Sequence, residues 1–225
     1  RIRSQEFLEG KWSKLYSKSN IPIDVIISPE REVAKSLFRK LEAPGALDNV
    51  PFVKDKVKLL EILIEKKCPI ANIPLKDLTK KFPEFKAYIF GAERKENFVF
   101  LKKNDQMKVG DKVYVVVSTD QINKLLSVFG HNEKLAKKIL IIGGGNVGLH
   151  LAKLLEATEG LRIKIIEKDK IRAEQIAGEL SSSIVICGDP LDEKILKEAN
   201  IEEIETVFAL TDDDEDNIMA CVLAE

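Results

Sequence analysis

Three glycines in the pattern G-x-G-x-x-G, Gly143, Gly145 and Gly148, have the spacing that most directly suggests a chemical role. An apolar run at residues 139–142 precedes them and predicts a buried strand, and apolar residues at helical spacing follow them. In this context the first glycine permits a tight turn, the second leaves room for a pyrophosphate, and the third lets the helix pack closely. Free N–H groups at the helix start would face the phosphates. The candidate dinucleotide-binding loop is Gly143, Gly144, Gly145, Asn146, Val147 and Gly148.

A carboxylate at the end of the next predicted strand, residues 162–167, supplies the second half of this pattern. Glu167 lies 167 − 148 = 19 residues after the last glycine, close to the roughly 20 expected for the acid that binds a ribose. A carboxylate there accepts hydrogen bonds from ribose hydroxyls and repels a 2′-phosphate, so the pair of motifs favours NAD over NADP. The alternative is a βαβ unit that binds no ligand.

Two further polar loops follow predicted strands at residues 184–187 and 206–210, at the sheet edge where ligands bind in doubly wound folds. In the first loop, Asp189 is a candidate for the adenine or its ribose, or a cap for a helix starting near Leu191. In the second, Thr211 and Asp212 are candidates for the nicotinamide ribose or the phosphates.

The acidic run at residues 212–216 has two further interpretations. One is an acidic helix start, which the helix dipole favours. The other is a divalent-cation site, although the spacing is not that of an EF-hand loop. We predict no metal site, because no Cys/His spacing suggests zinc either.

Composition limits the class of protein. Of 225 residues, 32% are charged and 44% hydrophobic, as in soluble globular proteins, and the net charge of −1 gives no argument for nucleic acid as a partner. Three scattered cysteines indicate reduced thiols in the cytoplasm. No run is long enough for a transmembrane helix, and no signal peptide is recognisable. Both ends, Arg1 and Glu225, fall within continuing patterns, so we expect a segment of a longer protein.

The order of predicted elements divides the chain. Residues 139–225 alternate strands and helices, which predicts an α/β, doubly wound parallel (Rossmann-type) sheet. Residues 51–130 predict a small α+β lobe of turn-linked strands with helices at its edge, and residues 131–138 a polar linker. Residues 1–50 hold a strand and a helix that begins at Pro29. The two histidines pair with no acid or nucleophile, so we predict no enzyme.

Together these motifs resemble the RCK (KTN) domain family, found in the cytoplasmic regulatory subunits of Trk-type bacterial potassium uptake systems. The resemblance is carried by residues 143–148, 167–169, 188–189 and 211–217 for a nucleotide lobe, 110–115 for a small C-terminal lobe, and 1–4, 23–30 and 42–47 for a preceding nucleotide lobe. It implies that residues 1–50 end a first Rossmann-type lobe, residues 51–130 form its small lobe, and residues 139–225 begin a second Rossmann-type lobe.

The resemblance also implies function. It implies NAD(H) binding without turnover, and it leaves ATP or ADP open as further nucleotides. It implies a homo-oligomer through RCK lobes and a Trk-type membrane potassium-translocating subunit as partner, at the inner face of the cell membrane. Arg1 matches an arginine that lies near the phosphates in the family.

Two other functions stay open from sequence: an NAD-dependent oxidoreductase, and an assembly module with a vestigial site. We also expect residues 1–50 to complete the sheet of residues 139–225, either within one chain or by a swap between two chains. The strand around Ile2 would then lie parallel to the one at 206–210.

Overall fold

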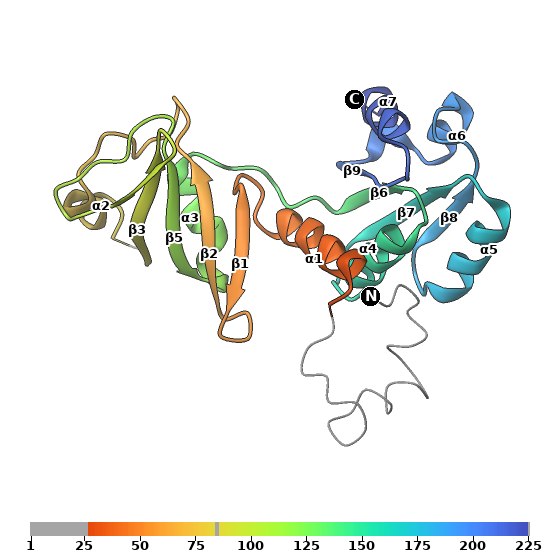
Figure 1. The fold of residues 1–225 in the computed structure, drawn as a ribbon, viewed down its shortest axis with the longest axis horizontal. Helices are drawn as coiled ribbons and strands as arrows, with labels where there is room; N and C mark the ends of the chain where they lie inside the picture. The colour runs from red at the N-terminus through yellow and green to blue at the C-terminus, as the bar shows by residue number, and fades with distance from the viewer. Residues whose placement is uncertain (1–26, 84–85, 225) are drawn as a thin grey trace, which may run out of the picture. The chain divides into compact units, whose positions relative to one another are not determined.

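The computed structural model describes residues 27–83 and 86–224, which fall into two compact units (Figure 1). Of the described residues, 38–136 form the antiparallel-sheet unit, and 27–37 with 137–224 form the parallel-sheet unit. The predicted fold class, a Rossmann-type lobe with a small α+β lobe, is confirmed. The elements are α1 (Pro29–Glu42), β1 (Asp48–Phe52), β2 (Val57–Leu63), α2 (Leu75–Lys81), β3 (Ala87–Arg94), β4 (Asn97–Phe100), β5 (Lys112–Ser118), α3 (Ile122–Phe129), β6 (Lys138–Ile142), α4 (Asn146–Glu156), β7 (Arg162–Glu167), α5 (Lys170–Glu179), β8 (Ile184–Cys187), α6 (Glu193–Glu198), β9 (Thr206–Ala209) and α7 (Asp214–Leu223).

The parallel sheet has the order β8-β7-β6-β9, which is the 3-2-1-4 order of a Rossmann half-sheet. Residues 139–142 of β6 are fully buried, because helices cover both faces of the strand. Leu140 and Ile142 pack with Leu196 of α6 and Ala220 of α7, and Ile141 lies beneath Gly148 of α4. The strand order reverses between β6 and β9, so a crevice opens there at their carboxyl ends.

The antiparallel sheet has the order β1-β2-β5-β3-β4. Burial alternates along β2 and β5, and α3 buries one face made of Ile122, Leu125, Leu126 and Phe129. The strand β1 was not predicted, and residues 48–50 were assigned to the preceding lobe. Lys138, assigned to the linker, is the first residue of β6.

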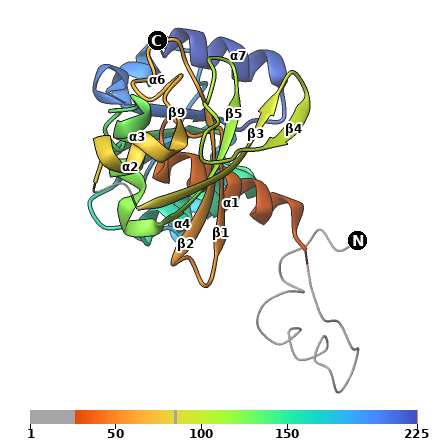
Figure 2. The ribbon, with the colours of Figure 1, turned by 90° about the vertical axis from the view of Figure 1, so that its left-hand side faces the viewer.

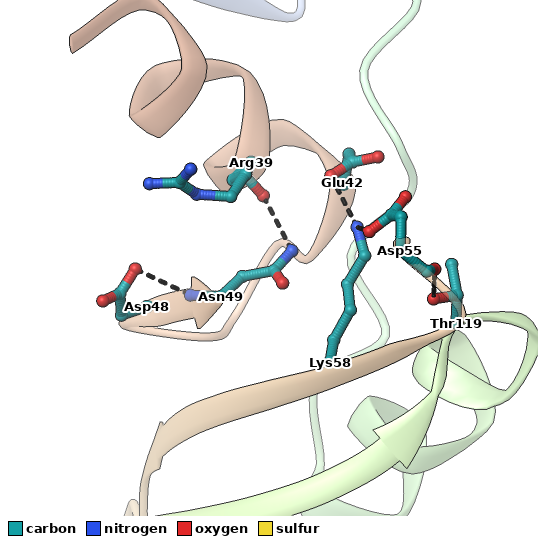
Figure 3. Close-up of polar contacts among 7 residues, drawn as sticks. All are labelled: Arg39, Glu42, Asp48, Asn49, Asp55, Lys58 and Thr119. Carbon is teal, nitrogen blue, oxygen red and sulfur yellow. Dashed lines mark hydrogen bonds and ion pairs between the residues drawn. The ribbon is translucent and has the colours of Figure 1, made fainter. Parts of the chain in front are cut away.

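Polar contacts explain why the sequence did not reveal β1 (Figure 3). The buried position of this strand holds Asn49, which is 2% exposed and donates to the carbonyl oxygen of Arg39 at 3.3 Å. On the neighbouring strand, Lys58 is 1% exposed, and its Nζ lies 2.7 Å from Glu42 Oε2 and 3.4 Å from Asp55 Oδ1. These contacts attach the last turn of α1 to the sheet with polar groups, so no apolar alternation marks the strand.

The expected pairing of residues 1–50 with the parallel sheet stays a prediction, because the strand around Ile2 lies outside the described residues. Among residues 27–83 and 86–224, β9 pairs only with β6.

The carboxylate of one residue, at the end of α4, holds the loop that follows α5. Glu156 accepts hydrogen bonds from the backbone N–H groups of Ser181, Ser182 and Ser183 at 2.7–3.1 Å, and from the Ser183 hydroxyl at 2.8 Å. Burial opposes ionisation, but these hydrogen bonds lower the pKa of Glu156 to about 2. The ionised Glu156 therefore contributes its full stabilisation of the folded state above the ordinary glutamate pKa. This contribution is lost as the pH falls from there toward 2.

We expect Glu156→Gln to lower the free energy of unfolding by about 1–2 kcal/mol at pH 7, because charge-assisted hydrogen bonds weaken. Urea denaturation at pH 7 and pH 3 measures it, with Glu159→Gln as the control on an exposed side chain. The difference between parent and Glu156→Gln should shrink at pH 3. An equal difference at both pH values contradicts this origin.

Candidate functional site

A cavity of about 520 Å³ lies at the carboxyl ends of β6, β7 and β9. Seven of the predicted site residues line it: Gly143, Gly145, Asn146, Val147, Glu167, Thr211 and Asp212. Its other lining residues are Glu30, Ile166, Lys168, Pro190, Leu210 and Asp216, which were not predicted to bind the nucleotide. The fold thus brings three separate sequence motifs to one crevice. Arg1 lies outside the described residues.

Protein atoms crowd three of the loop glycines, and at Gly143 and Gly148 the nearest of these atoms belong to the backbone. Gly143 has φ +103°, and a Cβ added there would lie 2.8 Å from the carbonyl oxygen of Leu210. A Cβ at Gly148 would lie 2.1 Å from the carbonyl oxygen of Gly143. A Cβ at Gly144 would lie 2.5 Å from Ile176 Cδ1. Close packing of the loop, β9 and α5 therefore accounts for these glycines without any ligand.

Gly145 differs from these three. Its φ is −62°, which any residue adopts, and a Cβ added there meets no atom within 4 Å. Since Gly145 lines the cavity, a side chain there would occupy space where a bound molecule could approach the backbone. Neither the backbone conformation nor close packing requires this glycine, whereas a closely approaching ligand would.

The start of α4 is also suited to an anion. Its N-cap is Gly145, and no side chain caps the helix. The three α-helices that follow it are each capped by an aspartate, Asp169, Asp192 and Asp213, which accepts a backbone N–H. The first N–H groups of the 11-residue helix α4 are therefore left to meet a partner from the cavity.

Glu167, predicted to bind a ribose, accepts hydrogen bonds from the backbone in this structure. Its Oε2 accepts the Gly144 N–H at 2.7 Å, and its Oε1 accepts the Asp169 N–H at 2.9 Å. The carbonyl oxygen of Gly144 accepts from Arg172 Nε at 2.8 Å, so both the N–H and the C=O of this loop residue are held by side chains. Each carboxylate oxygen retains a second lone pair for a hydroxyl. Sequence analysis missed Arg172, because no local pattern distinguishes it on the first turn of α5.

Asp189 does not line the cavity, but it binds a residue that does. Its Oδ2 lies 2.6 Å from the Nζ of Lys168, and its Oδ1 accepts the Leu191 N–H at 3.0 Å. These two hydrogen bonds lower the pKa of Asp189, and the pairing raises the pKa of Lys168. The suggested capping role was wrong, because α6 begins at Glu193 and Asp192 is its cap.

Thr211 is fixed by a side chain that the sequence did not single out. Its N–H and its Oγ1 each lie 2.9 Å from Asn217 Oδ1, and Asn217 donates to the Thr211 carbonyl oxygen at 3.1 Å. Asp213 caps α7, as expected for an acidic helix start. Within residues 27–83 and 86–224, no group of three or more His, Cys, Asp or Glu side chains could hold a metal ion.

Known families match both units. Residues 139–225 match the TrkA-N domain, and residues 59–130 match the TrkA-C domain. The chain is 42% identical over its whole length to the Trk system potassium uptake protein TrkA of Azorhizobium caulinodans, and 34% identical to that of Vibrio alginolyticus. It covers 49% and 48% of these relatives, so it spans about half their length.

Solved structures share the fold. The GsuK RCK domain matches 90% of this chain and 42% of its own with a TM-score of 0.56 at 16% identity. The GsuK channel bound to NAD matches 88% of this chain and 34% of its own with a TM-score of 0.54 at 15% identity. The two family matches and the identity over the whole of this chain lead to one conclusion: the chain belongs to the TrkA family, and its fold is that of RCK domains.

Proposed function

We propose that the parallel-sheet unit binds NAD(H) in the cavity at the carboxyl end of its sheet. The observation that carries this is Gly145, a glycine at the cavity wall that neither the backbone conformation nor the packing requires. A pyrophosphate approaching the uncapped start of α4 gives that glycine a reason. When bound, NAD(H) would stabilise whichever arrangement of the protein binds it more tightly.

The residues present fit such a ligand in distinct roles. The N–H groups at the start of α4, at Asn146 and Val147, would hold the pyrophosphate. Glu167 would accept a ribose hydroxyl with the oxygens that also fix Gly144. Thr211 and Asp212 would lie at the second half of the molecule, where Asn217 fixes the threonine.

The charge of the cavity favours NAD(H) over ATP in this proposal. The lining residues include four carboxylates, Glu30, Glu167, Asp212 and Asp216, and among the described lining residues a single ammonium, Lys168. A triphosphate carries more negative charge than a pyrophosphate, so its repulsion from these carboxylates is larger. We therefore expect ATP or ADP to bind more weakly than NAD(H).

At the level of the whole protein, we propose a regulatory subunit of a potassium uptake system and not an enzyme. Relatives of similar sequence are named Trk system potassium uptake proteins. The proposed partner is a membrane potassium-translocating subunit. A homo-oligomer of RCK lobes would contact it at the inner face of the cell membrane. Within the described ranges, no helix is both long and apolar enough to cross a bilayer. NAD(H) would act by binding one arrangement of the protein more tightly than another.

Calorimetric titration of the purified chain with NADH, NAD and ATP tests the nucleotide proposal. We expect NADH or NAD to bind at one site per chain, and ATP to bind more weakly. The ATP deficit should decrease at high salt, because salt screens the repulsion. Absence of binding by all three nucleotides contradicts the proposal, and tighter binding of ATP contradicts the charge argument.

Glu167→Ala should weaken NADH binding by roughly tenfold or more, because charge-assisted hydrogen bonds contribute about 1.5–3 kcal/mol each. The variant loses the ribose acceptor, and it also releases the Gly144 N–H. The same titration measures the effect, with Glu174→Ala, which removes an exposed carboxylate on α5, as the control. NADH affinity equal to that of the parent means that Glu167 does not contact the nucleotide.

A further inference from the structure

The cavity contains two opposing determinants at the end where the adenosine ribose would lie. Glu167 is the carboxylate expected to accept ribose hydroxyls and to repel a 2′-phosphate. Lys168, the next residue, also lines the cavity, and its side chain is 68% exposed. A cation in this region is the group that accommodates the 2′-phosphate of NADP(H). Lys168 therefore weakens the preference for NAD(H) that Glu167 alone would give.

The register of the parallel sheet brings an aspartate to this lysine. Glu167 of β7 pairs with Cys187 of β8, and the Gly188 N–H donates to the Glu167 carbonyl oxygen at 3.0 Å. The two strands therefore end side by side, and Lys168 and Asp189 follow them at the same edge of the sheet. The chain then continues to α6, which lies with α7 on one face of the sheet, whereas α4 lies on the other (Figures 1 and 2).

Asp189 is fixed by contacts of its own loop. Its Oδ1 accepts the Leu191 N–H at 3.0 Å, and its Oδ2 lies 2.6 Å from Lys168 Nζ. The loop packs closely on α6, because a Cβ added at Gly188 would lie 2.4 Å from Ile195 Cδ1. Asp189 does not itself line the cavity, whereas Lys168 does. The effect of Asp189 on a bound molecule therefore passes through the lysine.

We propose that Asp189 makes the site selective for NAD(H) over NADP(H), because it holds Lys168 and neutralises its charge. This inference rests on the proposed nucleotide binding and adds the residue pair that sets the choice of nucleotide. The 2′-hydroxyl of NAD(H) needs no cation, so the ion pair does not oppose its binding. The 2′-phosphate of NADP(H) would approach a lysine whose charge is already balanced, and the Asp189 carboxylate would repel it.

Glu167 adds to this selectivity because its carboxylate is held in place. Its two oxygens accept the N–H groups of Gly144 at 2.7 Å and Asp169 at 2.9 Å. A 2′-phosphate would therefore meet a fixed carboxylate on β7 and a lysine that is paired across to the loop after β8. Glu167 repels the phosphate directly, and Asp189 is the positioning residue that keeps the cation from offsetting this repulsion.

Calorimetric titration of the 225-residue chain with NADH and with NADPH tests the proposal, and the measured quantity is the ratio of the two dissociation constants. We expect Asp189→Asn to shift this ratio by about tenfold toward NADPH, because a negative charge is removed and Lys168 is released to the phosphate. The shift should decrease at high salt. Glu174→Gln, which removes an exposed carboxylate on α5, is the control for net charge and should leave the ratio unchanged.

Lys168→Met in the Asp189→Asn background shows whether the effect passes through the lysine. The second substitution should return the ratio to that of the parent or below it. An unchanged ratio in Asp189→Asn overturns the proposal, including the case in which both affinities fall equally because Asp189 contacts the nucleotide. A shift that persists in the double variant overturns it as well. Absence of NADH binding in the parent contradicts the proposed function itself, whereas an unchanged ratio in a chain that binds NADH contradicts only this inference.

Discussion

Gly145→Val is expected to lose NADH binding by about 100-fold or more while it keeps the thermal unfolding midpoint of the parent. The backbone there has an ordinary φ and an added Cβ meets no atom within 4 Å, so close packing does not oppose the substitution. The valine would instead fill the space next to the start of α4 and keep the pyrophosphate from its N–H groups. A 100-fold loss corresponds to about 2.8 kcal/mol, within reach of such a clash and the lost hydrogen bonds.

The matched comparison is Gly148→Ala in the same loop. Its Cβ would lie 2.1 Å from the Gly143 carbonyl oxygen, so this variant should be destabilised, with any loss of NADH binding following from misfolding. Calorimetry with NADH and thermal unfolding of both variants separate ligand contact from fold. If Gly145→Val binds NADH like the parent, or is as unstable as Gly148→Ala, the assignment of the pyrophosphate position is wrong.

Asp111→Ala should lower the free energy of unfolding of the antiparallel-sheet unit by about 3 kcal/mol. Asp111 is 2% exposed and receives a bidentate contact from Arg94, with Nε–Oδ1 at 2.8 Å and Nη2–Oδ2 at 2.6 Å. The Lys108 N–H donates to the same carboxylate at 2.8 Å. Removing one member of a buried pair leaves the other charge and the amide without their partner, which is strongly destabilising.

The pH dependence follows from the same contacts. Burial alone would raise the pKa of Asp111, but the hydrogen bonds from Arg94 and Lys108 lower it below its ordinary value. The contribution of Asp111 to the free energy of unfolding is therefore present at neutral pH, and it decreases as the pH falls below the ordinary aspartate pKa. Chemical denaturation measures it, with Asp77→Ala as the control because Asp77 pairs with the 82% exposed Lys80 at 3.8 Å. A loss no larger than that of Asp77→Ala contradicts the prediction.

The sequence alone determined the order of the elements in residues 139–225 and the motifs that line the cavity. The burial of β6 follows from a continuous apolar run, and the turn at Gly143 from a glycine pattern between a strand and a helix. The position of Glu167 follows from the length of one βαβ unit. These features depend on residues near one another in the chain, so local periodicity and spacing are sufficient to predict them.

Only the tertiary structure separated Gly145 from the glycines that packing requires, because the atoms that crowd Gly143 and Gly144 come from β9 and α5. It likewise identified Arg172 and Asn217 as the side chains that hold the loop and Thr211. It added β1, whose buried position holds Asn49 and which the sequence therefore could not mark by apolar alternation. In each case the decisive contact joins groups whose meeting depends on folding, and neither propensity nor spacing records which atoms will meet.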